Sequence, residues 1–339
     1  MAYTAGIRSV FHRKKRSTVH YVHSNRKGDV MLKYVLKRLG YILVTLWVIV
    51  TCTFFMMKNL PGTPFDAERF SIMTPQQQER VLEMYGLNDS LPMQYVKYIK
   101  NMLKGDLGTS FTYVNQDVSK VITGRLGPSA LIGIQAVLIG LAIGLILGIL
   151  AAWKHNSGID YFTMILAVLG VSVPNFVAAA LLQYYIGLKW GVLPVGFWTG
   201  WNCSVLPSIA LSFSATAMVA RFMRTEMLDV LDQDYIVTAR AKGLSQMKVL
   251  MRHAVRNSIL PVVTILGPIV VNLMTGSLAV ENIFSIPGIG SLFVDCIKAN
   301  DYPVIMGITI FYAAFYMLIV LLVDPVSHTH LTPPTNYSV

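Results

Sequence analysis

Charged residues are scarce in this sequence. Asp, Glu, Lys and Arg together make up 13% of the 339 residues, against about 25% in soluble domains, and the mean hydropathy is +0.55. Several apolar runs reach the roughly 20 residues that a helix needs to cross about 30 Å of hydrocarbon. The scarcity of charge therefore excludes an ordinary soluble domain and predicts an all-α membrane protein.

Cysteine is also scarce, and this excludes two kinds of protein. Cys52, Cys203 and Cys296 have neither the number of a disulfide framework nor the spacing of a metal site. Cys203 and Cys296 fall near the same predicted membrane face and could pair there, but we expect three separate thiols. A disulfide-stapled secreted domain and a cysteine-based metal module are both excluded.

The chain lacks the motif that a nucleotide-hydrolysing enzyme needs. No Gly-x-x-x-x-Gly-Lys-Ser/Thr phosphate loop occurs, so we expect no ATP hydrolysis, no cofactor and no metal on this chain. His253 lies in a basic segment and is expected to be exposed or locally bonded. Ser172, Ser212 and Ser214 fall in apolar runs, but no histidine lies within a run to activate them, which argues against an intramembrane protease. The sequence predicts a protein without catalytic residues.

Six apolar segments are long enough to be membrane spans, at 39–57, 129–153, 160–188, 203–220, 259–280 and 303–323. Their interiors hold no Asp, Glu, Lys, Arg or His, and Glu281 comes only at one end. Carriers that couple transport to protons or ions use ionisable groups at mid-membrane depth. A stand-alone secondary transporter or channel is therefore a disfavoured alternative, and a purely structural membrane protein is a third hypothesis.

Positive charge is unevenly distributed around these spans. Ten of the 28 Lys and Arg precede residue 39, and seven lie between Arg221 and Arg256. Lys and Arg gather in cytoplasmic loops, so we place both termini and 221–258 in the cytoplasm, with 58–128 outside. This distribution accounts for the net charge of +11 without a nucleic-acid partner.

These assignments divide the chain into five parts. Residues 1–38 form a cytoplasmic N-terminal segment, of which 1–30 are a native extension or residues added before the natural start. The first span, 39–57, is followed by an extracytoplasmic helical region, 58–128. The core with five further spans is 129–325, and 326–339 form a C-terminal tail.

Two short helices are expected in the region 58–128. Residues 74–77, Thr-Pro-Gln-Gln, combine a cap, a first-turn proline and a capping box, for a helix that ends near Gly86. Ser90 is expected to cap a second helix, which ends at Gly105. The apolar residues on one face of it are Met93, Val96, Ile99 and Leu103. We expect this region to pack, or else to help dock a substrate-binding protein.

Two features within the spans concern helix packing. Gly140, Gly144 and Gly148 recur every four residues, and such small-residue stripes let helices approach closely in lipid. Pro174 lies inside the segment 160–188, where it removes an internal hydrogen bond and is expected to kink the helix. The kink is either structural or part of a moving gate, and the sequence does not choose between these.

The longest polar stretch in the second half of the chain is 234–261. Residues 225–242 hold no Gly or Pro and predict a helix, which Gly243 ends because glycine readily adopts the left-handed conformation. Ser245 is expected to cap a second helix. The apolar residues on one face of that helix are Met247, Leu250, Met251 and Ala254, with Lys248, Arg252 and Arg256 around them. A basic helical hairpin between two spans suits the grip of a soluble partner.

This hairpin resembles the EAA loop of ABC importer permeases, in the variant of the oligopeptide, dipeptide and nickel group. In the general pattern a Glu-Ala-Ala triplet precedes a glycine, and Ile-x-Leu-Pro follows. Here Val-Thr-Ala at 237–239 takes the place of the triplet, Gly243 that of the glycine, and 259–261 that of the closing motif. Val237 replaces the acidic residue and the second gap is longer. Both departures agree with the form Thr-Ala-Arg-Ala-Lys-Gly-Leu at 238–244, which is typical of the peptide and nickel group.

Other segments resemble the same group in the order that the topology requires. They are 105–110 (GDLGTS), 190–195 (WGVLPV), 281–290 (ENIFSIPGIG) and 301–303 (DYP). The resemblance runs from about residue 31 to residue 325. The tail departs from it, because Val326 follows Pro325 where the group usually has a basic residue.

The resemblance implies a type I ABC importer permease fold with six transmembrane helices and a small extracytoplasmic helical insertion. It implies a coupling element that fits a groove on an ATPase, made of Thr238, Ala239, Arg240, Ala241, Lys242, Gly243, Leu244 and Ser245. The implied partners are a second homologous permease, two cytoplasmic ATPases that bind ATP and Mg, and an extracytoplasmic substrate-binding protein. Closure of the ATPases would move the spans between inward- and outward-open states. The implied cargo is an oligopeptide, with dipeptides and nickel chelates as alternatives, carried across the plasma membrane.

Overall fold

The computed structural model describes residues 36–59, 70, 72–84, 86–113 and 116–331, and these ranges are helical apart from turns, short loops and one isolated bridge between Thr109 and Asp117. The chain divides into two compact units, Met1–Cys52 and Thr53–Val339. The described part of the first unit is the beginning of the helix Leu36–Lys58. The predicted segment 1–30 lies outside the described residues.

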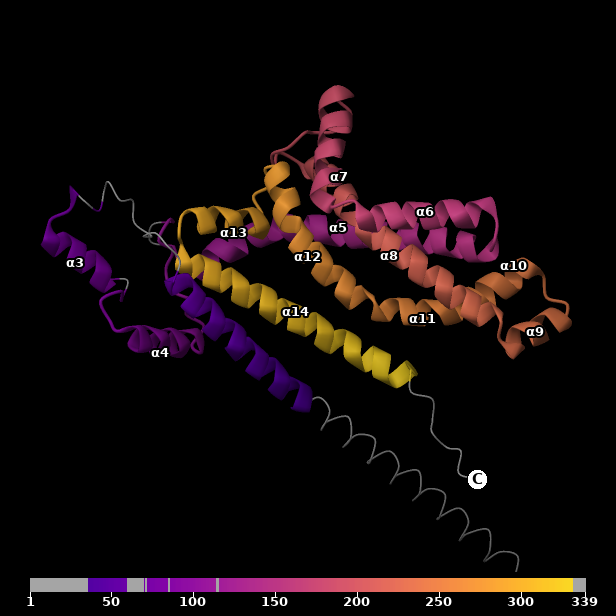
Figure 1. The fold of residues 1–339 in the computed structure, drawn as a ribbon, viewed down its shortest axis with the longest axis horizontal. Helices are drawn as coiled ribbons and strands as arrows, with labels where there is room; N and C mark the ends of the chain where they lie inside the picture. The colour runs from indigo at the N-terminus through magenta and orange to yellow at the C-terminus, as the bar shows by residue number, and fades with distance from the viewer. Residues whose placement is uncertain (1–35, 60–69, 71, 85, 114–115, 332–339) are drawn as a thin grey trace, which may run out of the picture. The chain divides into compact units, whose positions relative to one another are not determined.

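The second unit holds the helices labelled in Figure 1, α3 to α14, and three further elements that carry no label there, η1, η2 and η3. They are α3 Pro75–Met84, α4 Leu91–Met102, α5 Val118–Trp153, α6 Gly158–Ser172, α7 Asn175–Leu182, the π-helix η1 Gln183–Lys189, the 3₁₀ turn η2 Trp201–Ser204, α8 Val205–Leu231, α9 Asp234–Ala241, α10 Gln246–Val249, the π-helix η3 Leu250–Val255, α11 Arg256–Thr264, α12 Leu266–Ile283, α13 Ile289–Lys298 and α14 Tyr302–Leu331. Helix α14 continues eight residues beyond the predicted end of the last span.

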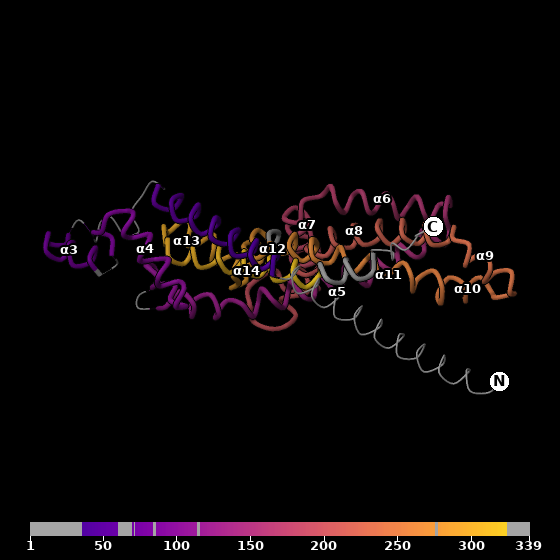
Figure 2. Tube along the Cα trace, turned by 90° about the horizontal axis from the view of Figure 1, so that it is seen from below, coloured from indigo at the N-terminus to yellow at the C-terminus, as the bar shows by residue number. Residues whose placement is uncertain are grey.

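The packing of α5 on α8 forms the centre of the core, and Figures 1 and 2 show the two helices running together. A Cβ atom added to Gly140 would lie 2.6 Å from Ala215 Cβ, and one added to Gly144 would lie 2.9 Å from the carbonyl oxygen of Thr216. At Gly148 the corresponding distance to the carbonyl oxygen of Ala220 is 2.7 Å. The glycine stripe therefore lets the two backbones approach, as predicted.

Substitution of Gly144 by Ala is expected to destabilise the core, although Ala favours a helix by about 1 kcal/mol over Gly. The added methyl group collides with the backbone of α8, and overpacking costs about 1–3 kcal/mol. Gly133→Ala is the matched control, because no atom lies within 4 Å of a Cβ at that position on the same helix. Thermal unfolding of the purified complex should show a lower Tm for Gly144→Ala alone; equal Tm values would contradict the close contact.

Four helices are long and apolar enough to cross a membrane, among the residues that the structure describes, and the number is six if each of two bent pairs counts as one span. The four are Leu36–Lys58, Val118–Trp153, Trp201–Leu231 and Tyr302–Val323. The bent pairs occupy the predicted spans 160–188 and 259–280. The number of spans therefore equals the predicted six only if each bent pair crosses the membrane once, and the second pair begins 13 residues before the predicted segment 259–280.

The predicted kink at Pro174 is a full break. Helices α6 and α7 differ in direction by 100°, and Figure 1 shows α7 standing away from the bundle while α6 lies along it. Proline lacks an N–H group and disfavours a helical conformation in the residue before it; Val173 accordingly is extended, with φ −83° and ψ 117°. The prediction of one kinked helix over 160–188 was wrong, because the chain forms two separate helices there.

The second interruption is milder and lies at Ile265. The segments Gln246–Thr264 and Leu266–Met274 differ in direction by 46°. The N–H of Ile265 donates to Val262 O at 3.2 Å, which tightens the last turn of α11. Next to this break, a Cβ on Gly267 would lie 3.4 Å from Val323 Cγ2, so the start of α12 packs on α14.

Helix α3 begins with the predicted capping box. The N–H of Thr74 donates to Gln77 Oε1 at 2.9 Å, and the N–H of Gln77 donates to Thr74 Oγ1 at 3.4 Å. Ser90 likewise is the N-cap residue of α4, with a proline in the first turn. Both helix starts are confirmed, but only the first is capped through side chains, because the Ser90 side chain makes no capping hydrogen bond.

The apolar face predicted for α4 does not face the protein. Met93, Val96 and Leu103 are exposed, whereas Tyr95 and Tyr98 pack on the ring of Phe54, with centroid distances of 5.4 and 5.9 Å. The aromatic residues on the other side of α4 therefore decide its orientation. The spacing of the apolar residues correctly predicted that a helix forms, but it did not predict which side of the helix packs against the protein.

Two buried carboxylates hold together segments that lie far apart in the sequence, at the end of the bundle where α13 lies. Asp301 accepts hydrogen bonds from Ser110 Oγ at 2.5 Å and from the N–H of Thr112 at 3.0 Å. Glu281 accepts from Ser129 Oγ at 2.8 Å and from the N–H of Ser291 at 3.1 Å. Asp301 therefore joins its own segment to the residues that follow 105–110, and Glu281 separately joins α12 to Ser129 of α5 and to Ser291 of α13.

The three cysteines are free thiols, as expected. Cys203 and Cys296 are both buried, in η2 and α13. Burial and, secondarily, the nearby carboxylates of Asp301 and Asp295 raise the pKa of Cys296 to about 12. That thiol is therefore protonated and inert in the folded chain near neutral pH.

Candidate functional site

The hairpin, defined as residues 234–255, follows directly from α8. Helix α8 ends at Leu231, and Gln233, with extended backbone (φ −79°, ψ 147°), is the N-cap of α9. The prediction of one helix over 225–242 was therefore wrong. No Gly or Pro marks this break, and the only local signal was the pair Asp232 and Asp234, a residue type that prefers helix ends.

Gly243 ends α9 as predicted, with φ +78°. Its N–H donates to Arg240 O at 3.0 Å, and the N–H of Leu244 donates to Ala239 O at 3.4 Å. This pair of bonds is the Schellman arrangement, which places a left-handed residue just after the helix. Ser245 then occupies the N-cap position of α10, without a hydrogen bond from its side chain. Local chemistry alone therefore builds the tip of the hairpin.

Seven of the eight predicted coupling residues are exposed together at this tip, and Ala239 is buried. Ile236, Ala239 and Val249 form a small buried cluster against Val230 and Leu231 at the end of α8. The hairpin is therefore fastened to α8 through apolar packing. Its tip is left free for a partner.

The face predicted for the second helix is divided in the structure. Leu250 and Ala254 are buried, but Met247 and Met251 are exposed. The second half of this face lies in η3, Leu250–Val255, a π-helix whose wider turn differs from the α-helix that was predicted; Met247 precedes η3, so the π-helix does not account for its exposure. The exposed apolar side chains of the hairpin are Tyr235, Val237, Leu244, Met247 and Met251.

An ion pair that the sequence did not reveal joins α6 to α8 next to the hairpin. Arg224 Nε donates to Asp160 Oδ1 at 2.6 Å, and its Nη2 donates to Asp160 Oδ2 at 2.8 Å. The N–H of Asn156 donates to the same carboxylate at 3.0 Å, and His155 Nδ1 lies 3.1 Å from it. The side chain of Asp160 is 3% exposed and that of Arg224 21%. A charged residue at the first position of an apolar span was the only available signal.

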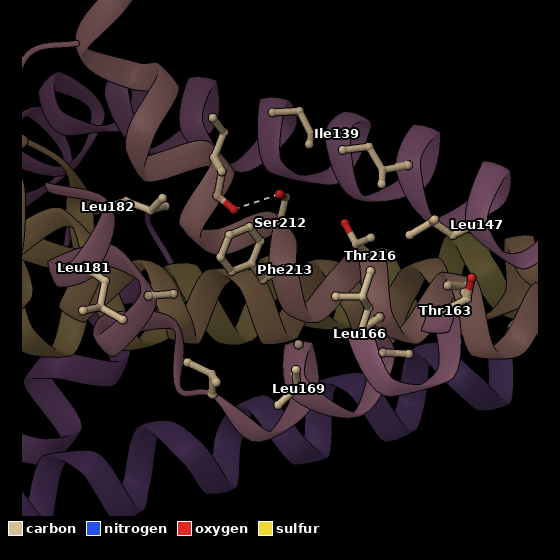
Figure 3. Close-up of a pocket in the computed structure, with 18 of the residues that line it drawn as sticks. Ile139, Leu147, Thr163, Leu166, Leu169, Leu181, Leu182, Ser212, Phe213 and Thr216 are labelled. Carbon is tan, nitrogen blue, oxygen red and sulfur yellow. Dashed lines mark hydrogen bonds between the residues drawn. The ribbon is translucent and has the colours of Figure 1, made fainter. Parts of the chain in front are cut away.

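A pocket of about 930 Å³ lies between α5, α6, α7, η1 and α8 (Figure 3). Its lining is almost entirely apolar, with Leu166, Leu181 and Phe213 among the labelled side chains. Of its few hydroxyl groups, Ser212 Oγ donates to the carbonyl oxygen of Ile209 at 2.8 Å. Such a lining suits apolar chains and offers little to a polar ligand.

The remaining predicted site residue, Pro174, is the N-cap residue of α7 at the α6–α7 break. Its neighbour Val173 lines the pocket. Ser214 Oγ, like Ser212 Oγ, is directed to a backbone carbonyl of its own helix, Leu211 O at 3.4 Å. His253 is half-buried within η3. No group of three or more His, Cys, Asp or Glu side chains that could hold a metal occurs among the described residues.

Two family profiles match most of the chain. The profile described as "Binding-protein-dependent transport system inner membrane component" matches residues 144–332, and the N-terminal membrane component of the same systems matches 31–127. The first match includes residues 326–331, which the sequence comparison by motif had left outside the resemblance. The profiles together cover both the hairpin and the region before α5.

Several relatives are similar over nearly their whole length. The dipeptide transport system permease protein DppB of Lactococcus lactis is 46% identical over 294 residues, 87% of this chain and 96% of the relative. DppB of Bacillus subtilis is 42% identical over 87% of this chain and 95% of the relative. The oligopeptide transport system permease protein OppB of Haemophilus influenzae is 37% identical over 91% of this chain and 100% of the relative.

A solved structure shows the same fold. The inward-facing MetNI methionine ABC transporter matches 63% of this chain and 98% of its own chain, with a TM-score of 0.54 and 14% identity. At that identity the likeness concerns the fold alone, which is that of a type I ABC importer permease.

These findings agree with the bundle of apolar helices and with the hairpin tip. The chain is a non-enzymatic transport component and a multi-pass inner-membrane protein. Membership of an ABC importer family implies ATPase and substrate-binding partners in general. The chain belongs to the family of binding-protein-dependent transport system inner membrane components, and it is an OppB/DppB-like permease subunit of an ABC importer.

Proposed function

We propose that this permease takes up peptides by alternating access and that the hairpin tip, Thr238–Ser245, receives the motion of a partner ATPase. The observation that carries the proposal is the exposure of seven of these eight residues on a hairpin that is packed against α8. A surface that a partner can reach, joined to a helix of the core, is what mechanical coupling requires.

The surface of the hairpin combines apolar and basic groups. Val237, Leu244, Met247 and Met251 are exposed apolar side chains, and Arg240, Lys242, Lys248 and Arg252 are exposed around them. Apolar contact supplies affinity, and the basic groups fix register against acidic groups of the ATPase. ATP and Mg bind on the partner, where nucleotide chemistry takes place.

Motion can pass from the hairpin to the spans through three contacts. The cluster of Ile236, Ala239 and Val249 fastens the hairpin to α8. The glycine stripe fastens α8 to α5, and the ion pair of Arg224 with Asp160 fastens α8 to α6. Since α5, α6 and α8 are held together at the hairpin end, a displacement of the hairpin moves them as one body.

The orientation that fits this scheme places both termini and the hairpin in the cytoplasm. The basic residues of the segment 221–258 support it through the positive-inside rule. Helices α3 and α4 and the network around Asp301 then face outward, where a substrate-binding protein delivers its cargo. The full assembly that we propose contains a second homologous permease and two ATPases.

Peptides are the proposed cargo because the relatives of this chain are named for dipeptide and oligopeptide transport. Sequence analysis favoured oligopeptides over dipeptides and nickel chelates. The two relatives named for dipeptides are the more similar ones, at 46% and 42% against 37%, so short peptides belong in the test beside longer ones.

Deletion of this permease is expected to abolish uptake of peptides and to leave uptake of free amino acids and of nickel unchanged. Growth of an auxotroph on peptides of two to six residues that contain the required amino acid measures both the class and the preferred length. Restoration by the wild-type chain is the control. Undiminished growth on every peptide would contradict peptide transport, and a selective loss of nickel uptake would favour the chelate alternative.

A further inference from the structure

Helix α12 differs from the other membrane helices in the side chains that it exposes. Helices α5, α6 and α14 all expose large apolar residues, such as Leu138, Ile165 and Leu318. Within the part of the chain that the structure describes, none of the exposed large apolar side chains belongs to α12. The described residues that α12 does expose are Pro268, Asn272, Ala279 and Asn282. This helix therefore presents no surface that suits hydrocarbon.

The four exposed residues of α12 lie on one face of the helix, which we call the α12 amide face. With 3.6 residues per turn, their positions fall within an arc of about 80°, and the face extends over about 21 Å along the helix axis. Ile269, Leu273 and Val280, on the other side of α12, are buried in the apolar core. The amide face is therefore continuous, and it runs most of the way through a hydrocarbon layer of about 30 Å.

An exposed amide at this depth requires a polar environment. Asn272 belongs to the second bent pair of apolar helices, in the segment Leu266–Met274. An amide side chain carries two donor hydrogens and an acceptor oxygen, and lipid tails offer no partner to any of them. Polar side chains within a span accordingly face the interior of a bundle or a water-filled cavity. The exposure of Asn272 on a face without large apolar residues therefore indicates that water reaches this side of α12.

We propose that the α12 amide face lines the passage through which peptides cross and that Asn272 and Asn282 hydrogen-bond the peptide backbone; this rests on the proposed uptake of peptides. An amide side chain donates and accepts hydrogen bonds, as each peptide bond of the cargo does, so it binds peptides whatever side chains they carry. No Asp, Glu, Lys, Arg or His lies among the exposed described residues of α12, and the face does not select cargo by charge. Ala279 and Pro268 add little bulk, which leaves room for a passing chain.

Thiol accessibility in the assembled importer tests the face. Asn272→Cys and Ala279→Cys are made separately, in case one of them fails to fold, in a Cys52→Ser background, because Cys52 is exposed whereas the other two native thiols are buried. Leu138→Cys on α5 is the matched control, since Leu138 is 60% exposed on a helix with an apolar surface. A charged methanethiosulfonate reagent should modify the α12 cysteines at least about tenfold faster than the control, because a thiol in apolar surroundings stays protonated and inert. Trialanine, supplied with the binding protein and ATP, should slow the reaction, and free alanine should not.

The other outcomes count against the proposal. Reaction rates at both α12 cysteines that equal the rate of Leu138→Cys would overturn it, because the face would then meet lipid or another helix. Fast reaction that trialanine does not slow would overturn it as well. Uptake of trialanine by the Cys52→Ser parent reports on the proposed function separately: uptake together with an unreactive face would refute the face and leave that function standing, and a parent that takes up no peptide would refute both.

Discussion

Replacement of Gly243 by Asp is expected to abolish substrate uptake and substrate-stimulated ATP hydrolysis while the chain still inserts into the membrane. Gly243 has φ +78°, and no atom lies within 4 Å of a Cβ built there, so the new side chain fits but strains the turn by about 1–2 kcal/mol. Its negative charge stands at the exposed tip between Lys242 and Leu244, in the surface that we assign to the ATPase. An uncompensated charge in such an interface is costly.

Gly191→Asp separates strain from coupling in the same measurement. Gly191 also has a positive φ, +63°, with no atom within 4 Å of its Cβ, but it lies after η1 and away from the hairpin. Uptake and ATP hydrolysis are measured in vesicles that contain the assembled importer, with and without the loaded binding protein. Wild-type uptake by Gly243→Asp, or an equal loss in Gly191→Asp, would contradict a coupling role for the tip.

Replacement of Arg224 by Ala is expected to lower the stability of the chain markedly. It leaves the carboxylate of Asp160, 3% exposed, without its main partner, and breaking a buried pair from one side costs about 3–5 kcal/mol. The denaturation midpoint of the detergent-solubilised complex measures this loss. Arg221→Ala is the matched control, since Arg221 is exposed on the same helix.

The double variant Arg224→Ala, Asp160→Asn tests whether the unpaired charge of Asp160 causes the loss of stability. Asn keeps the shape of the side chain but removes the stranded charge, so the double variant should recover part of the stability that Arg224→Ala loses. Equal midpoints for Arg224→Ala and Arg221→Ala would show that the pair contributes nothing. A double variant less stable than either single variant would show that the loss is not electrostatic.

Features that depend on neighbouring residues could be predicted from the sequence. The capping box of Thr74 and Gln77, the helix start at Ser90 and the turn at Gly243 all lie where expected, because each depends on residues within one or two turns. The six apolar segments were likewise visible, since hydrocarbon sets their length and composition. The motifs of the hairpin indicated the family, and the family profile confirmed it.

The directions of the helices, and the side on which each helix packs, could not be predicted in the same way. Pro174 predicted an irregularity, but only the folded chain turned it into a 100° break. The apolar alignment of Met93 with Val96 predicted a helix, yet the aromatic contacts of Tyr95 and Tyr98 decided which side packs. The predicted apolar face of the second hairpin helix is divided, with Leu250 and Ala254 buried but Met247 and Met251 exposed, and a π-helix begins at Leu250 where an α-helix was expected.

The sequence by itself determined that this is an apolar, helical, membrane-spanning protein with a hairpin between two spans, because backbone satisfaction in lipid and local capping leave few alternatives; that it is a permease followed from the resemblance of its motifs and from the family profiles. Only the tertiary structure decided which polar groups meet. Asp160 pairs with Arg224 across 64 residues, Glu281 accepts a hydrogen bond from Ser129 across 152, and Asp301 accepts one from Ser110 across 191. Each of these contacts depends on how distant helices pack, and no local pattern records that packing.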